Sequence, residues 1–456
     1  MNDLAAEEED PGLDTRRVTA ILEAVEAADA PRLAALVQPL HPADVADLLE
    51  QVSAPERREL LALLPDLIDG DILSELDESL REELIETLPR AQLAEAMREL
   101  DSDDVVDILE DLDAPQQQEI LESLDTADRA AVEKALSYPE NSAGRLMQRE
   151  VVMAPEHWTV GETTDFLRNA QHLPDQFYHV VLVDPRMRPT GYATLGRILS
   201  SPRETRLRDI LEDSFRTIPV TTPEEDVAYA FNQYHLISCP VVDENERLVG
   251  VITIDDAMAV LDDEAEEDML RLAGVGETVS IADGPFATIR TRLPWLVANL
   301  FTASLSAFVI SRFESTIAAI VSLAAVMPIV ASTGGIGGTQ SLAVAVRALA
   351  TRDLTSANAG RVVRRELLSG LVNGLGLALI LGIGGWLVYG DWRLGLVLGM
   401  AMIVNQVVAA MGGVLVPLGL ERLGLDPALA SGTFVTTLTD VMGYLSFLGL
   451  ATVLLL

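Results

Sequence analysis

Asp440 and its polar neighbours are the residues of this sequence with the clearest capacity for chemistry. Residues 428–456 are apolar for long enough to cross a bilayer, which takes about 20 residues in a helix, and Asp440 is the one acidic or basic side chain among them. A carboxylate at membrane depth costs roughly 2.5–3.5 kcal/mol, so it normally faces a bundle interior or a water-filled path. Helical spacing places Gly432, Thr436 and Thr437 on the same side as Asp440. Carboxylate, hydroxyl and carbonyl oxygens are ligands of hard cations, so we interpret this face as part of a cation pathway; a carboxylate that hydrogen-bonds a neighbouring helix is the alternative.

A glycine cluster in an earlier apolar stretch, residues 317–348, predicts a break in the helix at residues 334–338. Non-helical backbone at membrane depth persists only where protein buries it or where it lines a cavity. We therefore expect Gly334, Gly335 and Gln340 to line the pathway, together with Asn405 from a later stretch. Close helix packing is the alternative for the glycines, and a hydrogen bond between helices is the alternative for Asn405.

These residues need a membrane domain to position them, and residues 293–456 predict one with five spans. The spans cover residues 293–310, 317–348, 367–388, 394–420 and 428–456. Arginines gather at one side of these spans: Arg290, Arg292, Arg347, Arg352, Arg361, Arg364, Arg365 and Arg422. The loops on the other side hold Arg312 and Arg393. The positive-inside rule then places the N-terminal part in the cytosol and the C-terminus outside the cell membrane.

The charge of the chain is divided unevenly between its parts. Residues 1–290 hold 64 of the 71 acidic residues and 23 of the 32 basic ones, a formal charge of −41, whereas the remainder, with 7 acidic and 9 basic residues, carries +2. This division indicates a soluble acidic body joined to a membrane domain. Such a body repels nucleic acid and attracts cations. Cys239 is the sole cysteine and no apolar N-terminal stretch suggests a signal peptide, which favours a cytosolic soluble part.

Residues 1–140 predict an array of short helices. The segment that begins at Asp47 matches the segment that begins at Asp71, and a further copy begins at Glu95. Each unit is a short amphipathic helix with leucines at helical spacing and with Pro, Asp or Ser at its start. Such helices bury their apolar stripes only by stacking, so we expect a small superhelical domain. Asp103 and Asp107 lie one turn apart and could hold a divalent ion with a partner surface; a solvated surface is the alternative.

Residues 141–263 repeat one layout of strand, turn, strand and helix, in modules of about 141–203 and 204–263. In the second module Gly250, Thr253 and Asp256 form a G-x-x-T-x-x-D ending. In the first module Arg197 stands where this acid would be. The pair resembles tandem CBS domains, which often bind adenine nucleotides. The resemblance implies an ATP site at Thr253 and Asp256, in which the acid binds a ribose hydroxyl.

Residues 264–292 connect the soluble part to the first span. Six acids crowd two helical turns at its start: Asp262, Asp263, Glu264, Glu266, Glu267 and Asp268. Like charges one turn apart destabilise a helix by a few tenths of a kcal/mol per pair, so counterions or a basic partner must stabilise it. We expect a cation-sensitive helix, with a solvated linker as the alternative.

The whole chain resembles the MgtE magnesium channels. The most specific matches are RLPWLVANL from Arg292, ALATRDL from Ala348, DPALASG from Asp426, and the acid at Asp440. The resemblance implies a multi-domain α plus α/β membrane protein, with a helical domain, tandem CBS domains, a connecting plug helix and five spans. It also implies a homodimer with a central pore, in which Asp440 of each subunit contacts hydrated Mg2+.

The resemblance further implies that the plug helix closes the pore when cytosolic Mg2+ bridges acidic residues. The matching acids are Asp103, Asp107, Glu225, Asp256, Glu264, Glu267, Asp268 and Asp426. His235 and Ala259 stand where the family commonly has acids, which predicts weaker gating by Mg2+. Two further departures lie in the membrane domain, Ile336 in place of an asparagine and Thr433 in place of a proline.

Together these patterns predict a Mg2+-selective channel in a cell membrane, importing Mg2+ down its electrochemical gradient. A carrier that couples divalent ions to protons or sodium is one alternative, with Asp440 as the titrating group. A membrane-anchored sensor of metal or nucleotide that conducts nothing is another. We do not expect an enzyme, because the soluble part shows no Ser/His/Asp, Cys/His or phosphate-cradling arrangement.

Overall fold

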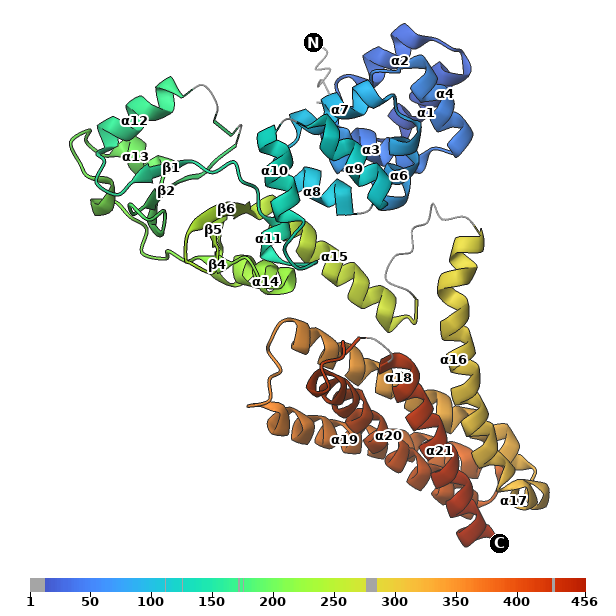
Figure 1. Ribbon diagram of the computed structural model, residues 1–456. Coiled ribbons are helices and arrows are strands. Elements are labelled where there is room, and N and C mark those ends of the chain that lie inside the picture. Colours follow the sequence, from blue (N-terminus) through green and yellow to red (C-terminus); the bar gives the residue numbers. More distant parts are fainter. Residues whose placement is uncertain are drawn as a thin grey trace, which may run out of the picture. The chain divides into compact units, whose positions relative to one another are not determined.

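The computed structural model describes residues 13–110, 112–124, 126–170, 173–174, 176–275, 285–428 and 431–456 (Figure 1). The chain divides into two compact units, Met1–Asp262 and Asp263–Leu456. The first unit contains the helical array and both strand-containing modules. The second contains the connector and the membrane helices. Residues 276–284 of the connector lie outside the described residues.

The first unit begins with the predicted array of short helices. They are α1 (Thr15–Glu26), α2 (Ala30–Val37), α3 (Pro42–Gln51), α4 (Ala54–Leu63), α5 (Gly70–Ser74), α6 (Glu78–Thr87), α7 (Arg90–Glu99), α8 (Ser102–Glu110), α9 (Ala114–Ser123) and α10 (Thr126–Ala135). Aspartates start several of them. The carboxylate of Asp69 accepts a hydrogen bond from the backbone N–H of Ile72 at 2.9 Å, and that of Asp113 accepts one from Gln116 at 3.0 Å. These contacts satisfy N–H groups that the helix leaves unpaired.

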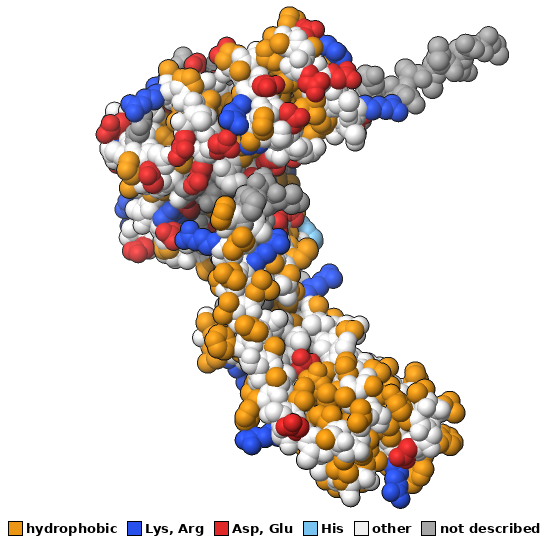
Figure 2. Space-filling view, turned by 90° about the vertical axis from the view of Figure 1, so that its right-hand side faces the viewer, with side chains coloured by type: hydrophobic (Ala, Val, Ile, Leu, Met, Phe, Trp, Pro, Cys, Tyr) orange, Lys and Arg blue, Asp and Glu red, His pale blue; other side chains and the backbone are white. Residues whose placement is uncertain are grey.

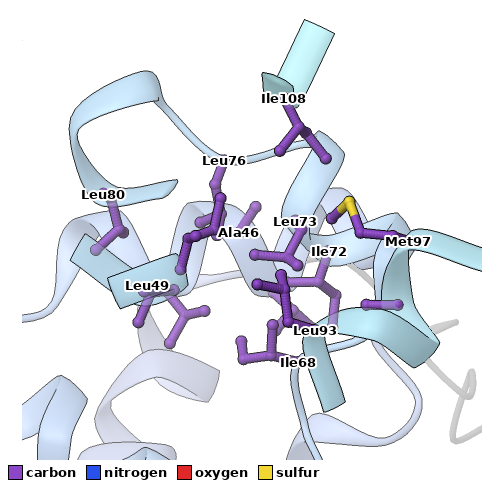
Figure 3. Close-up of a cluster of buried hydrophobic side chains, with 14 of the residues drawn as sticks. Ala46, Leu49, Ile68, Ile72, Leu73, Leu76, Leu80, Leu93, Met97 and Ile108 are labelled. Carbon is purple, nitrogen blue, oxygen red and sulfur yellow. The ribbon is translucent and has the colours of Figure 1, made fainter. Parts of the chain in front are cut away.

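The apolar stripes of these helices meet in one core, as the leucine spacing predicts. Figure 3 shows Leu49 of α3, Leu73 of α5, Met97 of α7 and Ile108 of α8 among its buried side chains. All four are at most 1% exposed. Burial of a side chain of this size stabilises the fold by about 1.5–3 kcal/mol, so stacking holds the array together.

The two modules have the same sheet topology. In the first, β1 (Met153–Pro155) pairs in parallel with β2 (His179–Val183), which pairs antiparallel with β3 (Pro189–Thr194). The second repeats this order with β4 (Ile218–Pro219), β5 (Ser238–Val242) and β6 (Leu248–Thr253). The remaining elements are α11 (Ala143–Leu146), α12 (Val160–Asn169), α13 (Leu195–Ser200), the 3-10 helix η1 (Leu207–Asp209) and α14 (Glu224–Tyr234). The sequence prediction of a repeated strand–helix layout is confirmed.

Helix α15 (Ile254–Leu272) joins the second module to the connector without interruption. The sequence predicts a domain boundary between residues 263 and 264. In the structure this position falls inside α15, next to the border between the two units. We call the second half of this helix, residues 264–272, the connector helix.

The second unit has the five predicted spans. Among the described residues, five helices are long and apolar enough to cross a membrane: α16 (Pro285–Ser311), α18 (Ser322–Ala350), α19 (Ala359–Tyr389), α20 (Trp392–Arg422) and α21 (Ser431–Leu455). A short helix, α17 (Glu314–Ala319), precedes α18. Figure 2 shows hydrophobic side chains over the surface of these helices, as a bilayer requires. The chain is therefore a multi-pass membrane protein.

The predicted break in the second span is wrong, because α18 is helical throughout residues 322–350. Its glycines serve close packing instead. A Cβ on Gly334 would lie 2.0 Å from the Nδ2 of Asn405, and a Cβ on Gly338 would lie 2.6 Å from the Cγ1 of Val435. Small residues let membrane helices pack closely, and this packing holds the helices together without a hydrophobic driving force. The sequence cluster alone did not distinguish this packing role from a break.

Candidate functional site

Asp440 lies on α21, which packs against α16, α17, α18 and α20. Its side chain is half-buried, and among the described residues its carboxylate has no hydrogen bond or ion pair. Thr436, one turn earlier, is also half-buried. Its Cγ2 lies 3.9 Å from the position that a Cβ on Gly335 would occupy, so α18 and α21 present these two predicted residues together. A carboxylate, a hydroxyl and accessible backbone thus share one region of the membrane unit.

Gly432, the third predicted residue of α21, touches the end of the connector helix. The carbonyl oxygen of Leu272 lies 3.0 Å from the position of a Cβ on Gly432. The side chain of Leu272 packs against a cluster of Leu342, Val346, Ala428 and Val435. A side chain larger than hydrogen at position 432 would therefore press on the connector. No local pattern in the sequence indicates this contact.

Asn405 and Gln406 hold α20 against α18. The Nδ2 of Asn405 donates to the carbonyl oxygen of Val330 at 2.8 Å, and the Nε2 of Gln406 donates to that of Thr333 at 3.0 Å. Asn405 is fully buried, and its Oδ1 has no hydrogen-bond partner in the described part of the chain. These contacts show the interhelical hydrogen bond that the sequence left open as an alternative. Gln406 was missed, although it is the next residue along the same polar stretch.

The four predicted pore-lining residues differ in their exposure. Gly335 is half-buried and Gln340 is exposed, both on α18. Gly334 and Asn405 are buried within the chain, where they serve the packing of α18 against α20. Whether any of the four lines a pore remains a prediction.

The structure brings together two of the predicted gating acids, Asp103 of α8 and Asp256 of α15. Burial raises the pKa of Asp103 well above its usual range, and the charge of Asp256 raises it further. Burial likewise raises the pKa of Asp256 to about 6 and that of Asp104 to about 7. Two carboxylates this close repel each other when both are charged, and a cation between them would remove this repulsion. Among the described residues no group of three or more Asp, Glu, His or Cys side chains is arranged to hold a metal ion.

Two other predicted gating acids have different surroundings. Asp107 forms an ion pair with Arg81 at 2.6 Å, and the arginine side chain is only 9% exposed. Glu225 is exposed in the first turn of α14. In this arrangement neither contributes to the pair of Asp103 and Asp256.

The connector acids meet an arginine that the sequence analysis missed. Arg271 forms ion pairs with Glu267, one turn earlier on α15, and with Asp426 in the segment before α21. Asp426 also accepts a hydrogen bond from the backbone N–H of Ala428 at 2.8 Å. The i, i+4 spacing of Glu267 and Arg271 could have revealed half of this arrangement. Glu264 and Asp268 are half-buried on the same helix.

The proposed nucleotide residues of the second module interact with each other. The hydroxyl of Thr253 donates to the carboxylate of Asp256 at 2.5 Å, and the backbone N–H of Thr253 lies 3.3 Å from it. This local turn starts α15. In the first module Arg197 pairs with Glu212 at 3.0 Å. An ATP site at Thr253 and Asp256 remains a prediction.

Comparisons with known proteins match several parts of this architecture. Residues 327–450 match the family described as divalent cation transporter, residues 40–141 match the MgtE intracellular N domain, and residues 207–263 match the CBS domain. The magnesium transporter MgtE of Thermus thermophilus is 37% identical over 72% of this chain and 73% of its own length. The magnesium transporter MgtE of Enterococcus faecalis is 36% identical over 70% of each chain.

A solved structure, the cytosolic domain of the Mg2+ channel MgtE in complex with ATP, is 32% identical and has a TM-score of 0.50. It covers 53% of this chain and 99% of its own. The matches thus extend over both the soluble and the membrane-spanning parts, in the order in which the structure arranges them. The chain belongs to the MgtE family.

Proposed function

We propose that this chain forms a channel that admits Mg2+ down its electrochemical gradient, with Asp440 as the carboxylate of the pore. The half-buried carboxylate of Asp440, without a hydrogen bond or ion pair among the described residues, carries the proposal. The alternative, a carboxylate that serves helix packing, would require a partner on a neighbouring helix. The names of the relatives, magnesium transporters of the same family, support the choice of ion. The family models that match describe a divalent cation transporter, an intracellular domain of it and a CBS domain, and we propose a transport function only.

The chemistry of Mg2+ fits this site. Mg2+ loses its water reluctantly and is seldom held by protein oxygens alone. The Asp440 carboxylate would attract the hydrated ion, and the hydroxyl of Thr436 and the backbone near Gly335 would contact its waters. The membrane potential would drive import, at about 2.3 kcal/mol per charge per 100 mV.

The assembly that we propose is a symmetric dimer with the two Asp440 helices near the axis. Only 6% of the most apolar part of α16 and 28% of that of α21 are buried in one chain, which leaves surface for a second copy as well as for lipid. Gly370 and Gly374 of α19 pack against α20 within one chain, so they are not available for a contact with a second copy. A Cβ on Gly376 would meet nothing within 4 Å, so this glycine remains available.

We further propose that the connector helix controls the pore from the arginine-rich side, which the positive-inside rule assigns to the cytosol. Its end lies on Gly432 and is paired through Arg271 to Asp426. Mg2+ between Asp103 and Asp256 would stabilise the soluble unit in the state that keeps the connector in place. Arg271 already supplies a positive charge where the connector helix meets Asp426. The contact between the connector helix and the segment before α21 would therefore depend less on Mg2+ than a contact between carboxylates alone.

Mg2+ flux into proteoliposomes tests the pore. Asp440→Asn keeps the shape of the side chain and should abolish most of the flux, and Asp440→Ala should abolish it while the protein stays folded. Asp391→Asn is the matched control, because Asp391 caps α20 by accepting from the N–H of Arg393 at 2.9 Å and asparagine can do the same. Unchanged Mg2+ flux in both Asp440 variants would refute the pore. Flux that depends on a pH or sodium gradient and not on voltage would indicate a carrier instead.

ATP binding at the second module is a further candidate, favoured by the ATP complex of the related cytosolic domain. Calorimetric titration of the full chain with ATP tests it. Thr253→Val and Asp256→Ala should each weaken binding, whereas Arg197→Gln, at the equivalent position of the first module, should not. Equal binding by all variants would contradict the site.

A further inference from the structure

A pocket of about 450 Å³ lies at the C-terminal ends of α18 and α20, and Asp440 of α21 is not among the residues that line it. Its floor is apolar and consists of Leu349, Leu354 and Leu418. Its rim is polar: Arg352, Thr355, Ser356, Glu421 and Arg422. The proposed cation pathway uses none of these residues. The last residues of α18 and α20 are Ala350 and Arg422, so the pocket lies at the level where two candidate spans leave the apolar part of the bilayer.

Arg352 adopts a backbone conformation that is unusual for an arginine. Its φ is +58°, in the left-handed region, and its N–H donates to the carbonyl oxygen of Leu349 at 2.9 Å to end α18. Gly274, Gly390 and Gly424 occupy the corresponding region after α15, α19 and α20, with φ between +71° and +73°. A residue with a Cβ is less favourable than glycine in this region. At the end of α18 the chain therefore carries a charged side chain where the ends of these other helices carry none.

The charge around the pocket is positive. Arg352 and Arg422 stand on the rim against one carboxylate, that of Glu421. Four more arginines lie on the adjoining ends of α18 and α19: Arg347, Arg361, Arg364 and Arg365. Two further carboxylates, those of Asp353 and Glu366, lie among them, so the arginines remain in excess. The surroundings of the pocket therefore attract an anion rather than Mg2+.

We propose that this pocket binds the phosphate group of an anionic phospholipid. Guanidinium groups match the geometry of phosphate oxygens and bind them through paired, charge-assisted hydrogen bonds. The hydroxyls of Thr355 and Ser356 are exposed on the same rim and can donate as well. Basic pockets between membrane helices at headgroup depth are typical of lipid recognition. The apolar floor favours a lipid over free phosphate, since it offers a contact for the glycerol and the first carbons of the acyl chains.

Native mass spectrometry of the full chain in detergent tests this proposal, with titration of phosphatidylglycerol, phosphatidylcholine or inorganic phosphate. Arg352→Gly removes the charge and keeps the left-handed turn, so this variant should fold. Arg422→Gln removes the second charge. Each should weaken phosphatidylglycerol binding about fivefold, since one basic residue at a membrane surface contributes about 1 kcal/mol. Arg393→Gln is the matched control, because Arg393 lies on the same helix at its opposite end.

The expected result is binding of phosphatidylglycerol that is weakened in Arg352→Gly and Arg422→Gln and kept in Arg393→Gln, with little binding of phosphatidylcholine. The proposal is wrong if all three variants bind phosphatidylglycerol like the parent. It is also wrong if inorganic phosphate binds as tightly and displaces the lipid, which would indicate a site for free anions. Thermal unfolding of each variant verifies that it is folded, and if one fails, the other decides the result.

Discussion

Replacement of Arg271 by glutamine removes the ionic contact between the connector helix and the segment before α21, and it keeps most of the side-chain length. Arg271 is 17% exposed, and its partners Glu267 and Asp426 are 26% and 27% exposed. Without the guanidinium, the two carboxylates face each other with no cation between them. The apolar contact of Leu272 with Leu342, Val346, Ala428 and Val435 remains. The variant therefore isolates the charge from the packing.

The burial of these groups sets the magnitude of the effect. An exposed ion pair contributes about 0–1 kcal/mol, whereas a hydrogen bond to a charged group in a protected site contributes about 1.5–3 kcal/mol. The pair with Glu267 lies within α15 and is kept when the connector undocks, so only the pair with Asp426 counts, and with this partner about a quarter exposed we expect roughly 1 kcal/mol. A change of this size shifts the ratio of docked to undocked connector by a factor of about 5.

Hydrogen exchange of the backbone amides in residues 264–275 measures this ratio, because exchange requires the helix end to open. In Arg271→Gln without Mg2+, exchange should be about fivefold faster than in the parent. Added Mg2+ should restore protection in the variant, since it can replace the guanidinium charge next to the carboxylates of Glu267 and Asp426, and should change the parent much less. Arg271→Lys keeps the charge without the forked geometry and should be intermediate. Equal exchange in parent and Arg271→Gln, or an equal response to Mg2+, would refute the role of Arg271.

Three further predictions concern other parts of the chain. The folded state raises the pKa of Asp256 from 3.8 to about 6, so it binds the proton more tightly than the unfolded chain does, and stability should rise as the pH falls from about 7 towards 4. Asp256→Asn should increase the free energy of unfolding at pH 7.5 by at most about 3 kcal/mol and should weaken its dependence on pH. Thermal unfolding from pH 5 to 8 measures both effects. Gly334→Ala would place its Cβ 2.0 Å from a side-chain nitrogen of α20 and should lower the free energy of unfolding by about 1–3 kcal/mol, whereas Gly384→Ala, with nothing within 4 Å, should be neutral; thermal unfolding measures both. His235→Asp with Ala259→Asp should shift the protection of the connector against protease to lower Mg2+, and an unchanged titration would show that these positions are not ligands.

The helices, the membrane spans and the acid of the last span could be predicted from the sequence alone. Leucine spacing predicted the short helices, because a helical period is a property of consecutive residues. Length and hydropathy likewise predicted the five spans, and the family motifs predicted the order of the domains. The acid at Asp440 stood out because a charge in an apolar stretch is costly wherever the stretch is placed. None of these inferences needed the position of a residue far away in the chain.

Features that depend on residues far apart in the sequence became apparent only in the folded chain. The glycines at 334–338 do not break α18. Residues on α20 and α21 lie close against this part of the helix and occupy the space that larger side chains would fill. Arg271 reaches Asp426, 155 positions along the chain, and the pKa of Asp103 depends on Asp256. The pocket beside Arg352 needs the ends of two helices that the sequence separates. Contacts of this kind have no local signature, since folding sets which side chains share a site, and burial there sets the cost of each charge.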